Sequence, residues 1–486
     1  MIPLPPKLAN LRIVHQVTGK SIEPHPHQWA AIGQVLGAER NRFGMYDTMG
    51  AGKSLSAFLV VAYLVAYGNR AICVMPPKLM PQFQKNFHAM FQGFDFTSGL
   101  LYKGKKCSPE AYEASPPDVL ITSPDFFLRH KEWLSDHKYD VMVQDEAKWL
   151  SNPETNMWKA THWYVTRDER ALVIMTGTPA RNDLINLYGF IKLTSPNLYY
   201  DIAQFKRLHI NYESFNVKAR NKAGREVTRR VNKISGYKNV ERIYEALYQN
   251  GRRIEMPPPT GVELLYKEVS LDDAHHAAYT KLVQEKLIIF EDNTVLDASQ
   301  AGAIRHAAMR AIFNPDTLKI SGEGVVLETV REMLEELDGK KVLLCAYYRE
   351  TVELLAKEFD GVCIYGGVSA SQAAQNKERF LTDPNCRVMV INYESGGVGL
   401  DGLQAVCHDA ISVEPTSVPG DFDQTVARLA RQGQENGVRF WSIIVHNTLY
   451  RSIVRDRLSK KANIAKVVRA TVWDLRKELF GEHHGS

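Results

Sequence analysis

The sequence predicts an α/β protein built from two parallel-sheet domains in tandem. Short, continuous apolar runs alternate with amphipathic helical stretches, first over about 40–195 and again over about 325–450. Strands that are apolar along their whole length are typical of parallel sheets covered by helices on both faces. The 486 residues leave room for two such domains and a further segment, because a domain commonly takes ~150 residues.

Each half of the chain supplies its own set of predicted strands. They cover 71–75, 118–122, 139–144 and 171–176 in the first half, and 341–347, 361–365, 386–391, 409–413 and 437–445 in the second. A typical intervening helix covers 327–338, where aliphatic residues three or four apart form one stripe. We expect a first lobe over 1–200, a basic insertion over 201–260 and a linker region over 261–325, both mostly helical, then a second lobe over 326–458 and a C-terminal helix or tail over 459–486.

Charge is distributed unevenly along the chain. Lys and Arg total 60 against 55 acidic residues, giving a formal charge of +5, which neither requires nor excludes nucleic acid as a partner. The segment 206–253, however, holds 13 basic and 4 acidic residues. Arg229 and Arg230 lie in this segment and are candidates for contacts with phosphate groups. A solvated basic excursion without a ligand is the alternative.

Composition argues against several other classes of protein. With 44% apolar and 24% charged residues, the chain resembles ordinary globular domains more than disordered or coiled-coil sequences. Its six cysteines include no Cys-x-x-Cys pair and four lie in apolar runs, which predicts buried thiols and no metal site. The N-terminus has no signal pattern, and the longest apolar stretch, 55–67, is too short to cross a bilayer. We therefore expect a soluble, cytoplasmic protein with no membrane partner.

The strongest local motif is Asp-Thr-Met-Gly-Ala-Gly-Lys-Ser at 47–54, between the apolar run 43–46 and a helical stretch that starts at Leu55. Backbone N–H groups of such a turn, together with the positive helix start, can hold phosphates. This interpretation places Lys53 on the β- and γ-phosphates and Ser54 on Mg²⁺. The strict phosphate-loop pattern has Gly where Asp47 stands, so an ordinary strand–helix turn remains the alternative. The loop residues concerned are Met49, Gly50, Ala51 and Gly52.

A pair of carboxylates follows another predicted strand. Asp145 and Glu146 come directly after the run 141–144. Ligands of parallel α/β sheets bind beyond the carboxyl ends of the strands, so Asp145 suits the shell of a nucleotide-bound Mg²⁺. Glu146 then suits a general base that orients the attacking water. An Asp-Glu pair by itself is more often a solvated loop, and its position about 90 residues after the phosphate loop is what makes it informative.

A further candidate lies in the second half. Gln424, Arg428 and Arg431 are spaced i, i+4 and i+7, which predicts one face of a helix. Two guanidinium groups on one face are often plain surface charge. In a tandem α/β protein they can instead stabilise charge on the γ-phosphate, for which the planar fork of Arg is suited.

Taken in order, these motifs resemble those of superfamily 2 helicase-type motors, and within them the Swi/Snf-type translocases of double-stranded DNA. The resemblance is carried by the phosphate loop at 47–54, Asp-Glu-Ala-Lys at 145–148, Thr-Gly-Thr-Pro at 176–179, Ser-Gly-Gly-Val-Gly-Leu at 395–400 and Gln-x3-Arg-x2-Arg-x-Gly-Gln at 424–434. Asn-Pro-Glu-Thr at 152–155 and Arg252-Arg253 before a proline-rich stretch are similar to that branch in particular. The branch carries Asp at the position of Asp47, which accounts for the missing Gly.

The resemblance implies two RecA-like lobes that bind ATP and Mg²⁺ between them. It implies adenine recognition by Gln28 and a role for Arg428 and Arg431 as arginine fingers. Contacts with the nucleic-acid backbone are implied at Lys78 and Ser123, and at Gly397 in the second lobe. Double-stranded DNA is the implied partner, and we expect a monomer.

Some features depart from the family pattern. Lys148 stands where the family has His, and Glu414-Pro-Thr-Ser-Val-Pro replaces the family's Trp-Asn-Pro turn. The insertions typical of nucleosome remodellers are short, which favours a minimal bacterial or viral motor. The alternatives are a strand-separating helicase acting on forked or branched DNA or on RNA, a nucleotide-binding switch subunit, and a small-molecule kinase.

Overall fold

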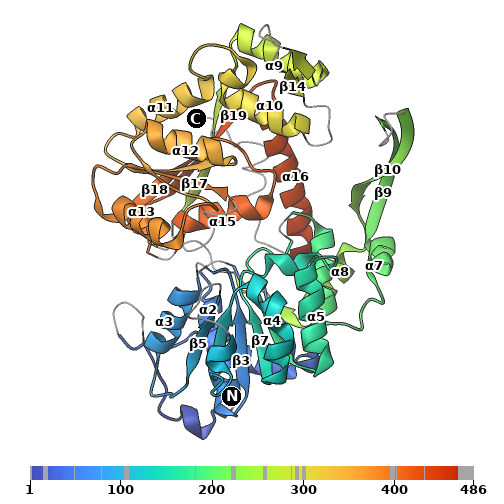
Figure 1. Cartoon of the computed structure of the whole chain (residues 1–486), viewed down its shortest axis with the longest axis vertical. Helices are drawn as coiled ribbons and strands as arrows, with labels where there is room; N and C mark the ends of the chain where they lie inside the picture. The colour runs from blue at the N-terminus through green and yellow to red at the C-terminus, as the bar shows by residue number, and fades with distance from the viewer. Residues whose placement is uncertain are drawn as a thin grey trace, which may run out of the picture. The chain divides into compact units, whose positions relative to one another are not determined.

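The chain divides into two compact units, the first made of Met1–Met256 with Asn463–Val472 and the second of Pro257–Ala462 with Trp473–Ser486. The computed structural model describes all residues except 1–2, 15–19, 49, 78, 103–108, 181, 221–225, 256–259, 286, 290–294, 298–302, 394–399, 401, 432 and 469–486. Each unit contains one large parallel sheet with helices on its faces (Figure 1). The predicted fold class of two tandem parallel-sheet lobes is therefore confirmed.

The first sheet has seven strands, and every neighbouring pair is parallel. In spatial order the strands are β11 (Gly251–Arg252), β2 (Arg42–Met45), β8 (Ala171–Met175), β7 (Tyr139–Gln144), β3 (Arg70–Val74), β6 (Val119–Thr122) and β5 (Ser98–Leu101). The four strands predicted for this half are all present, within a residue or two of their predicted ends. Strand β2 was not among the predicted strands, although its apolar run was noted before the phosphate loop. The edge strands β5 and β11 were not predicted either, because β5 is only half buried and β11 has two residues.

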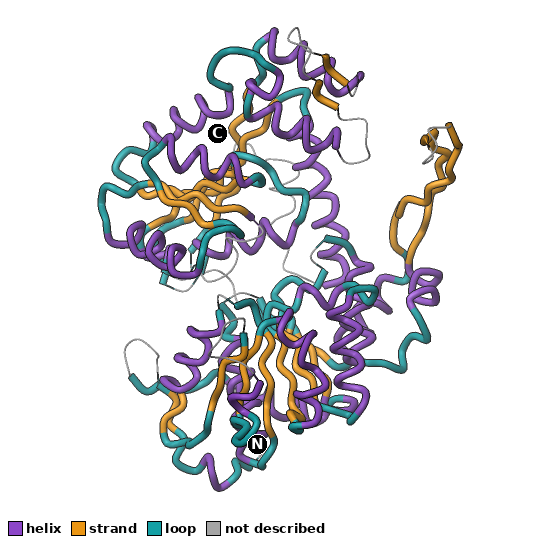
Figure 2. The backbone as a smooth tube through the Cα atoms, viewed as in Figure 1, coloured by secondary structure: helices purple, strands orange, loops and turns teal. Residues whose placement is uncertain are grey.

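Helices cover both faces of this sheet and enclose two apolar cores (Figure 2). The core on one face packs α1 (Pro26–Gly37), α2 (Lys53–Ala66) and α3 (Met80–Met90) against the strands. The core on the other face packs α4 (Pro124–Asp136), α5 (Asn156–Arg167), α6 (Leu187–Thr194) and α8 (Val240–Gln249). A small antiparallel pair, β1 (Arg12–Ile13) and β4 (Phe91–Gln92), borders the first core. This double cover explains why the inner strands are mainly apolar.

The basic insertion is a β-hairpin between two helices, not a mostly helical segment. After α7 (Ile202–His209), strands β9 (Ile210–Arg220) and β10 (Glu226–Tyr237) pair antiparallel and form a sheet of their own. The hairpin extends away from the rest of the first unit (Figure 1). The register of the two strands shifts between Ile234 and Gly236 of β10. Helix α8 and strand β11 then return to the core and the main sheet, so the end of the segment 201–260 belongs structurally to the first lobe.

The second sheet has six strands, again all parallel. Their order is β12 (Val262–Val269), β19 (Val438–Val445), β18 (Cys407–Ser412), β15 (Lys341–Ala346), β17 (Val388–Asn392) and β16 (Val362–Ile364). The five predicted strands are confirmed. Strand β12 lies in the region predicted as a helical linker; its charged and half-exposed residues hid its strand character.

The helices of the second unit surround this sheet and the small hairpin of β13 (Leu287–Ile289) and β14 (Val295–Asp297). They are α9 (Asp273–Glu285), α10 (Ala303–Phe313), α11 (Val325–Glu336), α12 (Arg349–Glu358), α13 (Ala370–Thr382), α15 (Pro419–Leu429) and α16 (Leu449–Val468). Across the described part of the chain, no helix combines the length and apolar character needed to cross a membrane.

Candidate nucleotide-binding site

The loop between β2 and α2 leaves the carboxyl edge of the first sheet. Gly50 and Gly52 adopt positive φ angles of 84° and 72°, which L-residues with side chains rarely adopt. Gly52 is also the N-cap of α2, and no side chain caps this helix end. The side chain of the N-cap residue therefore does not compete for the first N–H groups of α2, as expected at a phosphate site. Met49 lies outside the described residues.

Lys53 closes this loop. Its Nζ donates hydrogen bonds to the carbonyl oxygens of Asp47 at 2.8 Å and Thr48 at 3.0 Å. Burial lowers the pKa of Lys53, and the nearby carboxylates of Glu146 and Asp145 act in the opposite direction. The neighbouring Ser54 is exposed in the first turn of α2. The roles of Lys53 toward phosphates and of Ser54 toward Mg²⁺ stay predictions.

Asp145 and Glu146 follow β7, which lies between β3 and β8 in the sheet. The backbone N–H of Asp145 donates to the Val74 carbonyl at 2.9 Å, and its Oδ1 accepts from the Glu146 N–H at 2.9 Å. Burial, with the Glu146 charge as the next cause, raises the pKa of Asp145 to about 7, and Lys53 opposes this shift. A carboxyl whose charge is disfavoured in this way gains most from a bound cation. The oxygen ligands of Asp145 and Ser54 fit the preference of Mg²⁺.

Gln28 touches the same loop from α1. Its Oε1 accepts from the His25 N–H at 2.9 Å, and its Nε2 donates to the Gly52 carbonyl at 3.4 Å. The Nε2 of His27 lies 3.0 Å from the carbonyl oxygen of Ala51. Gln28 thus combines capping of α1 with a contact to the phosphate loop, and its role toward adenine stays a prediction.

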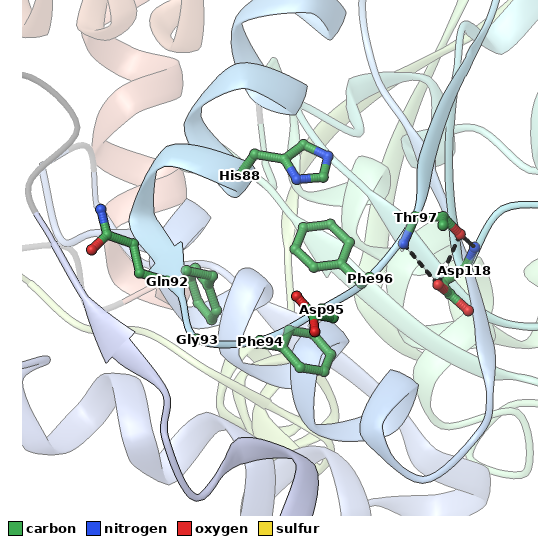
Figure 3. Close-up of a pocket in the computed structure, with 9 residues that line it drawn as sticks. His88, Gln92, Gly93, Phe94, Asp95, Phe96, Thr97 and Asp118 are labelled. Atoms are coloured by element: carbon green, nitrogen blue, oxygen red, sulfur yellow. Dashed lines mark hydrogen bonds between the residues drawn. The ribbon is translucent and has the colours of Figure 1, made fainter.

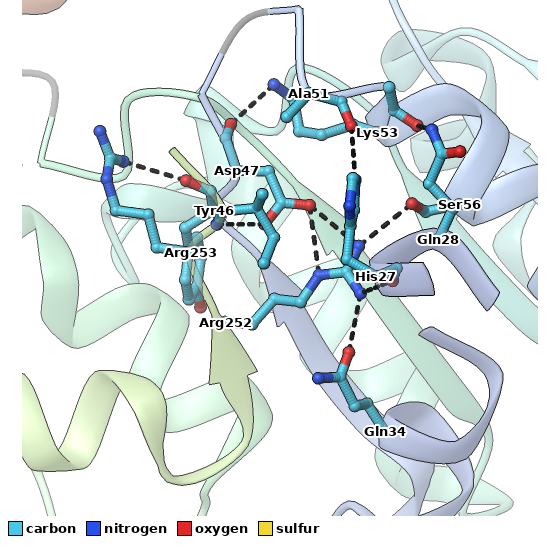
Figure 4. Close-up of polar contacts among 12 residues, drawn as sticks. His27, Gln28, Gln34, Tyr46, Asp47, Ala51, Lys53, Ser56, Arg252 and Arg253 are labelled. Atoms are coloured by element: carbon cyan, nitrogen blue, oxygen red, sulfur yellow. Dashed lines mark hydrogen bonds and ion pairs between the residues drawn. The ribbon is translucent and has the colours of Figure 1, made fainter. Parts of the chain in front are cut away.

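Sequence reasoning missed how Asp47 is used. Arg252 forms an ion pair with its carboxylate, with Nε and Nη2 at 3.2 and 3.0 Å from Oδ2. Both side chains are almost completely buried. Figure 4 shows Arg252 reaching across from β11 to the loop, close to Gln34 and Ser56. The pair Arg252-Arg253 was part of the family resemblance, and the side chain of Asp47 is the partner that the resemblance did not identify.

The arginines of the second unit lie at the end of α15. Arg428 is on the last turn of this helix and is buried. Helix α15 ends at Leu429, and the Arg431 N–H bonds to the Leu429 carbonyl at 3.1 Å in the turn that follows. The prediction that Gln424, Arg428 and Arg431 share one helix face is therefore wrong for Arg431. The helix stops two residues before Arg431.

Comparison with known proteins assigns the family. A family model for the SNF2-related domain matches residues 27–318, which is more than half of the chain. The chain belongs to the SNF2-related family. The match includes the phosphate loop at 47–54, the Asp145-Glu146 pair and the whole hairpin insertion, and it ends before the arginines of α15.

Several curated proteins are similar over most of this chain. The identity is 21% to the DNA repair and recombination protein RAD54-like of Drosophila erecta, over 94% of this chain and 64% of that protein. It is 22% to the DNA repair and recombination protein RAD54B of Gallus gallus, over 92% and 54%. It is 23% to Protein CHROMATIN REMODELING 24 of Arabidopsis thaliana, over 93% and 47%. The chain spans about one half to two thirds of the length of these relatives, and their animal and plant origin gives no support to a bacterial or viral context.

A solved structure also resembles this SNF2-related chain. It is the SWI2/SNF2 ATPase core of Sulfolobus solfataricus in complex with dsDNA. The sequence identity is 17%, the TM-score is 0.39, and the match covers 93% of this chain and 98% of that chain.

Only some of the residues expected to contact nucleic acid lie in the described part of the chain. Lys78, Gly397 and the side chain of Arg229 lie outside the described residues. Ser123 is buried and caps α4, with its Oγ accepting from the Phe126 N–H at 3.3 Å. Arg230 is exposed on β10, where it pairs in register with Asn216. These nucleic-acid roles all stay predictions.

A separate hollow of about 560 Å³ lies elsewhere on the first unit (Figure 3). It is lined by the end of α3 and by residues that precede β5 and β6, so it sits toward the amino edge of the sheet. The His88 ring stacks on Phe96 with centroids 4.4 Å apart, and Asp118 accepts two hydrogen bonds from Thr97, each of 2.8 Å. None of the predicted site residues lines this hollow. It therefore takes no part in the candidate nucleotide site.

Proposed function

We propose that this SNF2-related chain is an ATP-driven motor that moves along double-stranded DNA. The observation that carries the proposal is the arrangement of Lys53, Asp145 and Glu146 at the carboxyl edge of one parallel sheet, where α/β folds bind nucleotides. The names of the RAD54 relatives refer to DNA repair and recombination, processes that act on duplex DNA. We expect the chain to act as a monomer.

In the proposed cycle Lys53 exchanges its two carbonyl partners for the β- and γ-phosphates of ATP. Ser54 and Asp145 would hold Mg²⁺, which would offset negative charge on the phosphates. Glu146 orients the attacking water and accepts its proton. Arg428 and Arg431 of the second unit stabilise the charge that develops on the γ-phosphate, and Gln28 contacts the adenine. Changes in these contacts during hydrolysis would move one unit against the other along the duplex.

The hairpin insertion is the proposed DNA contact of the first unit. Arg230 is exposed on β10, and the adjacent Arg229 adds to the basic character of the segment. Lys78, Ser123 and Gly397 would add contacts from loops. Phosphate contacts of this kind are independent of base sequence and weaken as salt rises. Charge reversal at Arg229 and Arg230 should therefore weaken DNA-stimulated ATPase and flatten its salt dependence, while basal ATPase persists; unchanged stimulation would remove the hairpin from the DNA site.

An ATPase assay tests the central proposal. Hydrolysis is measured without nucleic acid and with single-stranded DNA, duplex DNA or RNA, for the wild type, Lys53→Ala and Glu146→Gln. We expect the strongest stimulation by duplex DNA and loss of at least two orders of magnitude in turnover for both variants. Displacement of a third strand from a triplex, without fork unwinding, identifies duplex translocation. The proposal fails if no polymer stimulates hydrolysis or if Lys53→Ala hydrolyses ATP like the wild type.

One observation favours a strand-separating helicase as a second candidate. Tyr212 and Phe215 on β9 are 45% and 46% exposed, and exposed aromatic rings can stack on unpaired bases. In a helicase, the double variant Tyr212→Ala/Phe215→Ala should lose fork unwinding while duplex-stimulated ATPase remains. A wild type that unwinds no fork removes this candidate.

A further inference from the structure

Arg252 connects the nucleotide loop to neighbouring parts of the first unit. We propose that Arg252 is a positioning residue, which cancels the charge of Asp47 and holds the loop 46–52 in the shape that receives the phosphates. The inference rests on the proposed function, because it concerns the same nucleotide. It adds a role for a residue that follows the hairpin insertion and touches no reacting atom.

The guanidinium of Arg252 is fully used. Besides the Asp47 carboxylate, its Nη2 donates to Ser56 Oγ at 3.1 Å, and its Nη1 donates to Gln34 Oε1 at 2.8 Å and the His27 carbonyl at 2.5 Å. One side chain thereby joins α1, the loop and α2, all of which contribute to the nucleotide site (Figure 4). A fork that makes charge-assisted bonds in several directions fixes position better than a single ammonium can.

The charge of Asp47 makes this pairing necessary. Phosphate loops that follow the strict pattern have Gly at this position, so a carboxylate here adds a negative charge beside the phosphates. Its influence reaches the site, because the Asp47 charge acts to raise the pKa of Lys53. Asp47 is completely buried, and its other oxygen, Oδ1, accepts from the Ile254 N–H at 2.8 Å. Without Arg252, the buried charge would be uncompensated and would oppose phosphate binding.

The strand that carries Arg252 is paired with the loop itself. Arg252 lies opposite Met45 in the parallel pairing of β11 and β2. The Tyr46 N–H donates to the Arg252 carbonyl at 2.9 Å, and the Thr48 N–H donates to the Ile254 carbonyl at 2.9 Å. The chain that returns from the hairpin therefore continues the sheet alongside the first residues of the loop, and the position of Arg252 is set by this pairing.

The test uses the full chain with Arg252→Gln, Asp47→Asn and the double variant. Affinity for a fluorescent ATP analogue is measured without DNA, and kcat and KM for ATP are measured with saturating duplex DNA. We expect Arg252→Gln to raise the dissociation constant and KM about tenfold or more, with a much smaller effect on kcat. The double variant should recover most of the affinity, because no charge is left unpaired. A double variant that binds as weakly as Arg252→Gln overturns the proposal.

A matched control separates positioning from general destabilisation. Arg170 is another buried arginine of the first unit, paired with Asp168 at 2.5 Å and bonded to Ser135. Arg170→Gln should lower the melting temperature while the affinity for ATP stays that of the wild type. If Arg252→Gln behaves in the same way, Arg252 has a structural role only and the inference is overturned.

Two further outcomes keep the test decisive. If Arg252→Gln does not fold, Arg252→Lys, which keeps the positive charge, takes its place. Arg252→Lys alone should then bind ATP more tightly than the double variant Arg252→Lys/Asp47→Asn. Equal affinity in the two backgrounds overturns the proposal. A wild type that neither binds nor hydrolyses ATP refutes the proposed function, whereas wild-type affinity in Arg252→Gln, in a chain that does hydrolyse ATP, overturns this inference alone.

Discussion

Glu414 gives the second unit a stability that depends on pH. This residue follows β18 and is completely buried. Its Oε2 accepts from the N–H groups of Tyr347 and Tyr348 at 2.8 and 2.9 Å, and its Oε1 accepts from Thr351 Oγ1 at 2.8 Å. Burial raises the pKa of Glu414 from 4.5 to about 7, although all three hydrogen bonds favour the charged form.

The sign and size of the effect follow from this shift. Because the folded-state pKa lies above the unfolded value, the protonated group favours folding below pH 4.5, and this contribution is lost as pH rises through about 7. The full shift corresponds to about 3 kcal/mol, of which about 2 kcal/mol falls between pH 5.5 and 8.5. Glu414→Gln removes the titration. The amide oxygen can still accept from both N–H groups, while the amide nitrogen can donate to Thr351 Oγ1.

The assay is equilibrium urea unfolding of the wild type and Glu414→Gln at pH 5.5 and 8.5. Between pH 5.5 and pH 8.5 the wild type should lose about 2 kcal/mol of unfolding free energy that Glu414→Gln keeps. Glu335→Gln, which removes an exposed carboxyl from α11, serves as the control and should follow the wild type. Parallel pH dependences for the wild type and Glu414→Gln would refute the reasoning.

Two other predictions concern the nucleotide loop and helix α15. Gly52→Ala should raise KM for ATP several-fold, because φ is +72° and a Cβ would lie 2.1 Å from Gln28 Nε2; Gly37→Ala, whose Cβ meets nothing within 4 Å, should leave KM unchanged. Lys461 of α16 pairs with Asp423 of α15 at 3.1 Å. Asp423→Lys places two lysines face to face, so it should shift α15, which also carries Arg428, and lower the turnover number of the proposed ATPase. Adding Lys461→Asp should restore the turnover, and a swap that restores nothing would exclude this contact as the cause.

The sequence predicted the buried strands well and the exposed ones poorly. A strand covered on both faces, such as β8, is recognisable because all of its residues are buried and apolar. Strand β12 is only half buried and carries charges, so its sequence lacks that signal. The described residues of the hairpin β9–β10 are mostly exposed, and its polar sequence is typical of a loop. The part of the fold that could be predicted is therefore the part in which burial restricts the choice of residue at each position.

In the candidate site, too, some positions could be predicted from local sequence and others could not. Lys53, Asp145 and Glu146 could be predicted because each follows a buried strand in a short motif. Arg431 was placed on the wrong structural element, since i, i+4, i+7 spacing predicts a helical face but not where the helix ends. The partner of Asp47 could not be found from local pattern, because Arg252 lies 205 residues further along the chain.

The separation between Asp47 and Arg252 has a consequence for how the site forms. From its sequence alone, the segment 47–54 resembles a phosphate loop in which Asp47 stands where the strict pattern has Gly. In the folded unit the Asp47 carboxylate pairs with Arg252, which the chain supplies only after the hairpin and α8, from strand β11 of the main sheet. The loop and the return strand must therefore fold together. A change that prevents β11 from pairing with β2 should impair ATP binding even though every residue of the loop itself is unaltered.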